Sequence, residues 1–246
     1  MEWKEWQPIY YDIVNRLGLD SSMDIQATQL LTDLLMNINP SPLLRFLEQK
    51  ISNRTVVICG AGPSLEKHVQ TLKERSDYQD LVFVAADGAV SLLLEQNCPC
   101  DIIVTDLDGD YNHIKQATQN GALCIVHGHG DNIDKILDMV PQLGQVLGST
   151  QVEPTERVFL WGGFTDGDRA CYVVTKYSPE RVILAGMDFG TIVGKWSKPS
   201  HETHFPAPQR KRVKLEIAHV LITTLFDRID IPYTILQSIP RIGDES

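Results

Sequence analysis

The sequence predicts an α/β fold: a doubly wound, mostly parallel, Rossmann-like sheet with an N-terminal helical segment. Two observations support this prediction. Short continuous apolar runs, rich in β-branched residues, recur from Thr55 onward, and stretches of helical length separate them. Buried strands that alternate with helices are typical of a parallel sheet covered on both faces and joined by right-handed crossovers.

The first part of the chain indicates helices without strands. Apolar side chains recur there at helical spacing, as at Ile13 and Leu17. We therefore expect a helical segment over residues 1–54 and an α/β domain over residues 55–246.

Six apolar runs are expected to form strands, and each is short enough to be one strand of a buried sheet. They are TVVICG (55–60), LVFVAA (81–86), DIIVTD (101–106), ALCIV (122–126), RVFLWG (157–162) and RVILAG (181–186). A helix is expected over residues 213–228, and PYTIL (232–236) is expected to add a last strand.

Composition excludes several classes of function. The 246 residues include 22 lysines and arginines and 32 acidic residues, a net charge of −10 that disfavours a nucleic-acid partner. No apolar run reaches the roughly 20 residues that cross a bilayer, the start of the chain lacks a signal-peptide pattern, and the five cysteines lack metal or redox spacing. We expect a cytoplasmic protein without a membrane partner. Trp3, Trp6 and Tyr10 are expected to be exposed, where they would bear on homo-oligomer formation.

Glycine and small polar or acidic residues follow every expected strand. The segments are GAGPS (60–64), DGA (87–89), DLDGD (106–110), HGHGDN (127–132), GGFTDGDRA (162–170) and GMDFG (186–190). Turns favour such residues in any protein. However, the carboxyl ends of parallel strands share one edge of the sheet, and ligands bind at that edge. Six such segments in one chain favour a binding site there.

The DLDG segment contains the strongest candidate metal ligands. Side chains at alternate positions of an extended strand point to the same side, so Asp106 and Asp108 are expected to converge if the strand continues to its tip. Asp87 follows the preceding strand and is a third candidate ligand. Paired carboxylates are suitable ligands for Mg²⁺, which retains water and substrate phosphates in its coordination shell. The alternative is a solvated acidic turn.

The GAGPS segment begins a turn directly after a strand. Gly60, Gly62 and Ser64 are expected to present backbone N–H groups and a helix N-terminus to a nucleotide phosphate. Leu65 stands where the dinucleotide fingerprint has its third glycine, so the motif is incomplete and a plain tight turn is the alternative.

The segments HGHGDN (127–132) and GGFTDGDRA (162–170) add candidate substrate contacts. Asp131 is expected to join the acidic cluster, whereas the neighbouring histidines are expected to form hydrogen bonds and not to bind a metal. Asp166 and Asp168 are expected either to cap a helix or to contact substrate. The guanidinium of Arg169 is a candidate for bidentate hydrogen bonding to a phosphate.

Residues 195–214 carry a local positive charge in an otherwise acidic chain, because they include six lysines and arginines and one acidic residue. A cationic loop beside an acidic metal site suits the transfer of a polyphosphate, because metal and lysines share the neutralisation of its oxygens. Lys195, Lys198 and Lys211 are the candidates, and a solvated basic turn is the alternative.

Seven motifs in order resemble the archaeal 6-hydroxymethyl-7,8-dihydropterin pyrophosphokinases of the MptE type. They are GAGPSL (60–65), AADGA (85–89), PCDIIVTDLDG (99–109), HGHGDN (127–132), GGFTDGDRA (162–170), LAGMDFG (184–190) and KRVKLEIA (211–218). A more distant similarity to thiamine pyrophosphokinases rests on Asp87-Gly88 and on Asp106 to Gly109.

The resemblance implies transfer of diphosphate from ATP to the pterin, with AMP as the second product, in tetrahydromethanopterin-type or folate-type biosynthesis. It implies that Mg²⁺ is held by Asp87, Asp106 and Asp108, and that ATP is contacted by Gly60, Gly62 and Ser64. Asp131, Asp166 and Asp168 would hold the pterin edge or a second metal, because a carboxylate suits the amino and ring N–H donors of a pterin. Lys195, Lys198 or Lys211 would close over the phosphates, with no choice among them. The catalytic residues would be Asp106, Asp108, Lys195 and Lys211.

Other classes of function remain open on the sequence alone. Asp-Leu-Asp also fits the short metal motif of sugar-nucleotide glycosyltransferases, and a Rossmann-like sheet also suits a non-catalytic nucleotide-binding module. An NAD(P) dehydrogenase is disfavoured by Leu65.

Overall fold

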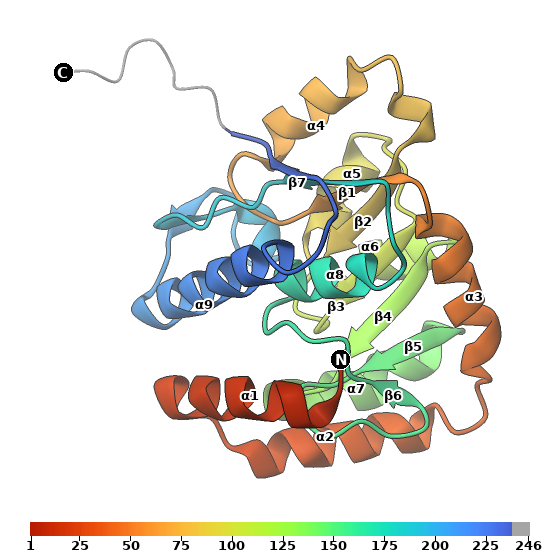
Figure 1. The fold of residues 1–246 in the computed structure, drawn as a ribbon, viewed down its shortest axis with the longest axis vertical. Coiled ribbons are helices and arrows are strands. Elements are labelled where there is room, and N and C mark those ends of the chain that lie inside the picture. The colour runs from red at the N-terminus through yellow and green to blue at the C-terminus, as the bar shows by residue number, and fades with distance from the viewer. Residues whose placement is uncertain (238–246) are drawn as a thin grey trace.

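The computed structural model describes residues 1–237, and residues 238–246 of the expected α/β domain lie outside it. Its central element is an eight-stranded parallel sheet in the order β10-β7-β1-β2-β3-β4-β5-β6 (Figure 1). The strands are β1 Thr55–Cys59, β2 Val82–Ala86, β3 Ile102–Thr105, β4 Leu123–His127, β5 Val146–Ser149, β6 Val158–Phe159, β7 Arg181–Ala185 and β10 Tyr233–Ile235. The predicted doubly wound fold is confirmed.

The six expected strands and the expected last strand all form, because strands buried on both faces are continuous apolar runs. All five residues of β2 are buried, for example. β5 was not among the predicted strands; in it Val146 and Leu147 are followed by Gly148 and a polar residue. A Cβ at Gly148 would lie 2.9 Å from Val158 Cγ2 and 3.0 Å from Leu35 Cδ1, so glycine permits the close packing of β5 against β6 and the N-terminal segment.

Helices cover both faces of the sheet and produce two hydrophobic cores. One core contains Val56 and Ile58 of β1, and the other contains Val57 and Cys59. The first core is covered by α1 Trp3–Leu17, α3 Pro40–Ile51, α8 Asp166–Thr175 and α9 Gln209–Phe226. The second is covered by α2 Ser21–Leu34, α4 Leu65–Lys73, α5 Ala89–Glu95, α6 Tyr111–Gln119 and α7 Ile133–Met139.

The N-terminal segment is helical as predicted, and it shares both cores with the sheet. The expectation that Trp6 and Tyr10 are exposed is wrong, because both side chains are fully buried. Trp6 Nε1 donates a hydrogen bond to the Gln151 carbonyl at 2.9 Å, and Tyr10 Oη donates to Asp24 at 2.6 Å. These rings therefore hold the N-terminal helices on the sheet instead of offering an oligomer surface.

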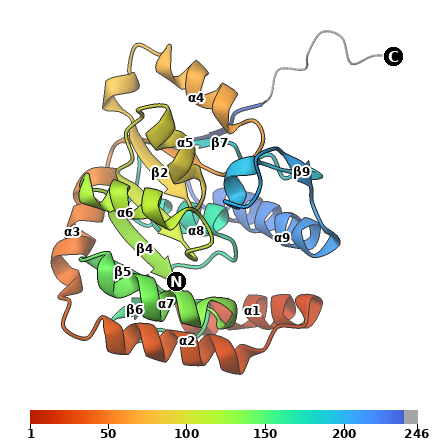
Figure 2. The same cartoon turned by 180° about the vertical axis from the view of Figure 1, so that it is seen from behind.

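The basic segment after β7 folds back beside α9 (Figure 2). It contains the antiparallel strands β8 Ile192–Val193 and β9 Phe205–Pro206. Four single 3₁₀ turns complete the described elements: η1 Tyr78–Asp80, η2 Gly130–Asn132, η3 Val140–Gln142 and η4 Lys195–Ser197. The last helix spans 209–226 and not the predicted 213–228. In the part of the chain that the structure describes, no helix combines the length and apolarity that a membrane span requires.

Candidate functional site

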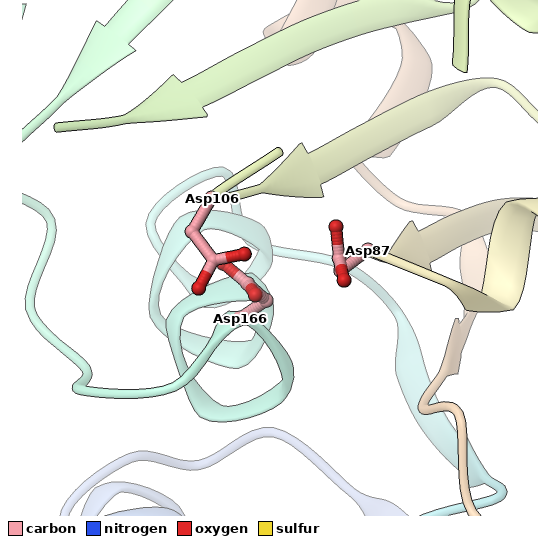
Figure 3. A group of neighbouring side chains, drawn as sticks. All are labelled: Asp87, Asp106 and Asp166. Atoms are coloured by element: carbon pink, nitrogen blue, oxygen red, sulfur yellow. The ribbon is translucent and has the colours of Figure 1, made fainter. Parts of the chain in front are cut away.

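Three aspartates gather at the carboxyl edge of the sheet. Asp87 follows β2, Asp106 follows β3, and Asp166 is the first residue of α8. One carboxylate oxygen of each lies within 4.8 Å of one from each of the others. Figure 3 shows Asp106 and Asp166 side by side, with Asp87 opposite them at the end of the neighbouring strand. We call these three residues the acidic triad.

Asp87 is fixed by its own backbone and by two hydrogen bonds. Its φ of 45° lies in the left-handed region, directly after β2. Its Oδ1 accepts hydrogen bonds from Thr105 Oγ1 at 2.6 Å and from the Gly109 amide at 2.9 Å. Burial and the nearby charge of Asp106 raise the pKa of Asp87 to about 7.

Asp106 is the member of the acidic triad that most favours its charged form. Burial would raise its pKa, but His129, Lys198 and the Asp108 amide outweigh burial and hold the pKa at about 2. The distance from His129 Nε2 to the Asp106 carboxylate is 3.5 Å. Burial and the charges of Asp106 and Asp87 instead raise the pKa of Asp166 well above its usual range.

Asp108 lies near the acidic triad but contacts cations. The expectation that the extended strand continues to Asp108 is wrong, because β3 ends at Thr105 and Leu107 has a φ of 65°. The Leu107 amide donates a hydrogen bond to Thr105 Oγ1 at 2.8 Å, which stabilises this turn. The Asp108 carboxylate contacts the ammonium groups of Lys135 and Lys198.

Two cavities meet at this edge. The β1–β7 cavity, of about 140 Å³, is bounded by the segments that follow β1 and β7. The α2–α9 cavity, of about 480 Å³, is bounded by the start of α2, the segment after β4 and the start of α9. Both cavities are lined by Asp106, Asp108, Thr165, Asp166, Lys198 and Lys211. Two members of the acidic triad therefore lie where two ligands would meet.

The glycine segment after β1 packs against the segment after β7. The amides of Gly60 and Gly62 donate to the carbonyls of Ala185 and Gly186 at 2.8 and 3.0 Å, and the Ser64 amide donates to Asp188 Oδ2 at 3.1 Å. A Cβ on Gly62 would collide with Asp188 Oδ2, so the close approach requires glycine. The N–H groups that were expected to face a phosphate are thus paired within the protein.

Ser64 stands at the N-terminus of α4, but its hydroxyl does not cap the helix. The hydroxyl is hydrogen-bonded to His68 Nδ1 at 3.2 Å. Gly60 and Gly62 line the β1–β7 cavity, whereas Ser64 is buried and lines neither cavity.

Asp168 caps α8, one of the two roles expected for it. Its carboxylate accepts hydrogen bonds from the amides of Phe164 at 2.6 Å and Thr165 at 2.8 Å. Burial raises the pKa of Asp168 and lowers that of Arg169. Arg169 Nη2 bonds to His127 Nε2 at 2.9 Å, while no described residue bonds to Arg169 Nε or Nη1. Arg169 thus forms an internal wall of the α2–α9 cavity.

The remaining candidates differ in their distance from the acidic triad. Lys198 and Lys211 line both cavities, and Asp131 lines the α2–α9 cavity. Lys195 lines neither cavity, and its Nζ lies 4.5 Å from the centre of the Trp196 ring.

The donor atoms of the acidic triad fit a hard divalent cation. Each of the three residues offers a carboxylate oxygen, the ligand type that Mg²⁺ prefers over nitrogen or sulfur. Burial and the charges of neighbouring carboxylates raise the pKa values of Asp87 and Asp166, and a bound cation would neutralise the charge that burial and repulsion disfavour.

The fold and the site define a Rossmann-like α/β protein with an acidic site suited to a divalent cation at the carboxyl edge of its sheet. The family model described as 6-hydroxymethylpterin diphosphokinase MptE-like matches residues 28–194. The chain belongs to this family.

Three curated relatives carry the name 6-hydroxymethyl-7,8-dihydropterin pyrophosphokinase. The protein of Methanocaldococcus jannaschii is 39% identical over 95% of this chain and 99% of its own length. The protein of Pyrococcus furiosus is 41% identical over 92% of this chain and 94% of its own length. The protein of Methanothermobacter thermautotrophicus is 36% identical over 92% of this chain and 95% of its own length. The family resemblance predicted from the motifs is confirmed.

Proposed function

We propose that the protein transfers diphosphate from ATP to 6-hydroxymethyl-7,8-dihydropterin in a Mg²⁺-dependent reaction. The observation that supports this most strongly is the acidic triad, because two of its members, Asp106 and Asp166, line both cavities. The chain's relatives are named 6-hydroxymethyl-7,8-dihydropterin pyrophosphokinase. The product would enter a tetrahydromethanopterin-type or folate-type cofactor.

The reaction forms one bond and breaks one. The hydroxymethyl oxygen of the pterin bonds to the β-phosphorus of ATP, and the bond from that phosphorus to the oxygen bridging the α-phosphate breaks. AMP leaves with that oxygen, and at neutral pH one proton is released. Such transfers require mainly positioning and charge neutralisation from the protein.

The residues of the junction divide these tasks. Asp87, Asp106 and Asp166 would hold Mg²⁺, which supplies charge neutralisation at the phosphate oxygens. Lys198 and Lys211 line both cavities and would bind the oxygens of the transferred group.

Asp108 acts in this proposal mainly as a positioning residue, because its carboxylate contacts the Lys198 ammonium. It can become the metal ligand expected from the sequence only by exchanging that contact for the cation. Asp131 remains a candidate substrate contact in the α2–α9 cavity.

The test is a product assay with ATP, Mg²⁺ and 6-hydroxymethyl-7,8-dihydropterin. We expect equal amounts of AMP and pterin diphosphate, and we expect neither product when EDTA is added. ADP in place of AMP, or no nucleotide product, would contradict the proposal. A nucleotide sugar that is consumed instead would favour the glycosyltransferase alternative.

A further inference from the structure

The two cavities differ in charge once their shared lining is set aside. The charged side chains that line only the β1–β7 cavity are carboxylates, those of Asp87, Asp168 and Asp188. The α2–α9 cavity adds three cations to its own three carboxylates, namely Arg169, Arg210 and Lys214. An anionic ligand is therefore repelled by the first cavity and accommodated by the second.

The cavities also differ in size and in the polarity of their walls. The β1–β7 cavity, of about 140 Å³, has apolar walls formed by Met187, Phe189, Ile192 and Leu215. The α2–α9 cavity is more than three times as large, at about 480 Å³. A compact, flat and uncharged ring fits the first, and a nucleoside triphosphate needs the room and the cations of the second.

Asp188 is the polar group placed to orient a ring in the β1–β7 cavity. Its Oδ2 accepts a hydrogen bond from the Ser64 amide, and its carboxylate lines the cavity wall beside Gly62. A pterin presents its 2-amino group and ring N3–H as adjacent donors, which match the two oxygens of one carboxylate. The cavity lies between β1 and β7, where the order of the strands along the sheet reverses.

We propose that the β1–β7 cavity binds the pterin, with Asp188 as the residue that recognises its amino edge, and that the α2–α9 cavity binds the nucleotide. This assignment rests on the proposed function, and it reverses the expectation that the glycine segment contacts ATP. The pterin hydroxymethyl group then faces Asp106 and Asp166, and the ATP phosphates reach the same point between Lys211 and Lys214.

Two variants test the assignment, and each removes one charge from the lining of one cavity. In Asp188→Asn the amide oxygen can keep the Ser64 hydrogen bond, while the amide nitrogen presents a donor to the donors of the pterin. We expect the KM for the pterin to rise roughly 10- to 100-fold, because hydrogen bonds to a charged group are lost, and the KM for ATP to stay within about two-fold. Lys214→Gln is the counterpart, and it should raise the KM for ATP several-fold and leave that for the pterin unchanged.

A direct titration separates this assignment from the reaction itself. The fluorescence of 6-hydroxymethylpterin, the oxidised form of the substrate ring, is followed in the absence of ATP as wild-type protein or Asp188→Asn is added. Leu215→Trp is the second variant: it fills the apolar wall, and it should weaken pterin binding while it leaves binding of a non-hydrolysable ATP analogue intact.

The outcomes are distinguishable. If the wild-type protein forms no AMP, the proposed function is refuted. The titration then still tests, independently of the reaction, whether the β1–β7 cavity binds the pterin. If Asp188→Asn or Leu215→Trp weakens nucleotide binding and spares the pterin, the assignment of the cavities is overturned.

Discussion

Replacement of Asp87 by asparagine should stabilise the metal-free protein while it abolishes activity. Asp87 has a buried carboxylate beside Asp106, and its pKa is raised from 3.8 to about 7 by burial and by that charge. An asparagine has no charge to bury, and its amide oxygen can still accept from Thr105 and Gly109. The variant tests whether the acidic triad binds a cation at a cost to the stability of the metal-free protein, or whether its carboxylates stabilise the fold.

The magnitude follows from the pKa. One pKa unit corresponds to about 1.36 kcal/mol, so an ionised Asp87 costs the folded state about 4 kcal/mol above pH 7. Weaker hydrogen bonds to a neutral acceptor offset about 1–2 kcal/mol of the gain. A net stabilisation of about 2 kcal/mol should raise Tm by about 4–8 °C in a chain of this length.

The pH dependence has a definite sign. Below about pH 4 the carboxyl group is protonated in the folded and the unfolded chain, so its charge costs nothing. Between pH 4 and 7 only the unfolded chain loses the proton, so wild-type stability falls as the pH rises. The advantage of Asp87→Asn should therefore grow over that range and level off above pH 7.

Thermal unfolding by circular dichroism, with and without Mg²⁺, measures these effects. Mg²⁺ should raise the Tm of the wild type and leave that of Asp87→Asn nearly unchanged. The control is Asp138→Asn on the exposed side of α7, which should change neither Tm nor activity. A lower Tm for Asp87→Asn without metal, or retained AMP formation, would refute the reasoning.

Three further predictions concern other parts of the molecule. Asp106→Asn should lower kcat/KM for AMP formation at least 100-fold with a Tm within a few degrees of wild type; a large loss of Tm with retained activity would make this residue structural. Lys198→Gln should lower kcat about ten-fold or more, whereas Lys195→Gln, whose lysine lines neither cavity, should not; equal effects in steady-state assays would contradict this division. Trp6→Ala should destabilise the chain by about 3–5 kcal/mol in urea unfolding, because the indole is fully buried, and a change below 1 kcal/mol would show that α1 does not contribute to the core.

The sheet could be predicted because each of its buried strands is a local pattern. The segments from Thr55 to Cys59 and from Val82 to Ala86 are continuous apolar runs, and such runs indicate buried parallel strands without any knowledge of the rest of the chain. The strand β5 was not predicted because it contains Gly148. The reason for a glycine at this position is close packing against Leu35 and Val158, which only the folded chain shows.

The candidate site could be predicted only in part, because its details depend on distant contacts. The carboxyl edge follows from parallel topology, so Asp87 and Asp106 were expected together. The pairing of Asp108 with lysines depends on a left-handed turn at Leu107, for which an apolar residue gives no local signal. The Ser64 amide meets Asp188 across 124 positions of sequence, and only the folded chain brings them together.

The burial of Trp6 and Tyr10 shows the same limit. An amphipathic helix predicts that one face is covered, but it does not say which element covers it. Here the partners include Gln151, which lies 145 positions from Trp6 along the chain.

The most direct test of the account is to locate the cation. Crystals of the protein with Mn²⁺ and a non-hydrolysable ATP analogue would be measured at the manganese absorption edge. We expect an anomalous peak within bonding distance of carboxylate oxygens from Asp87, Asp106 and Asp166. A fully occupied metal bound elsewhere, with these three side chains left without an ion while the nucleotide is bound, would contradict it.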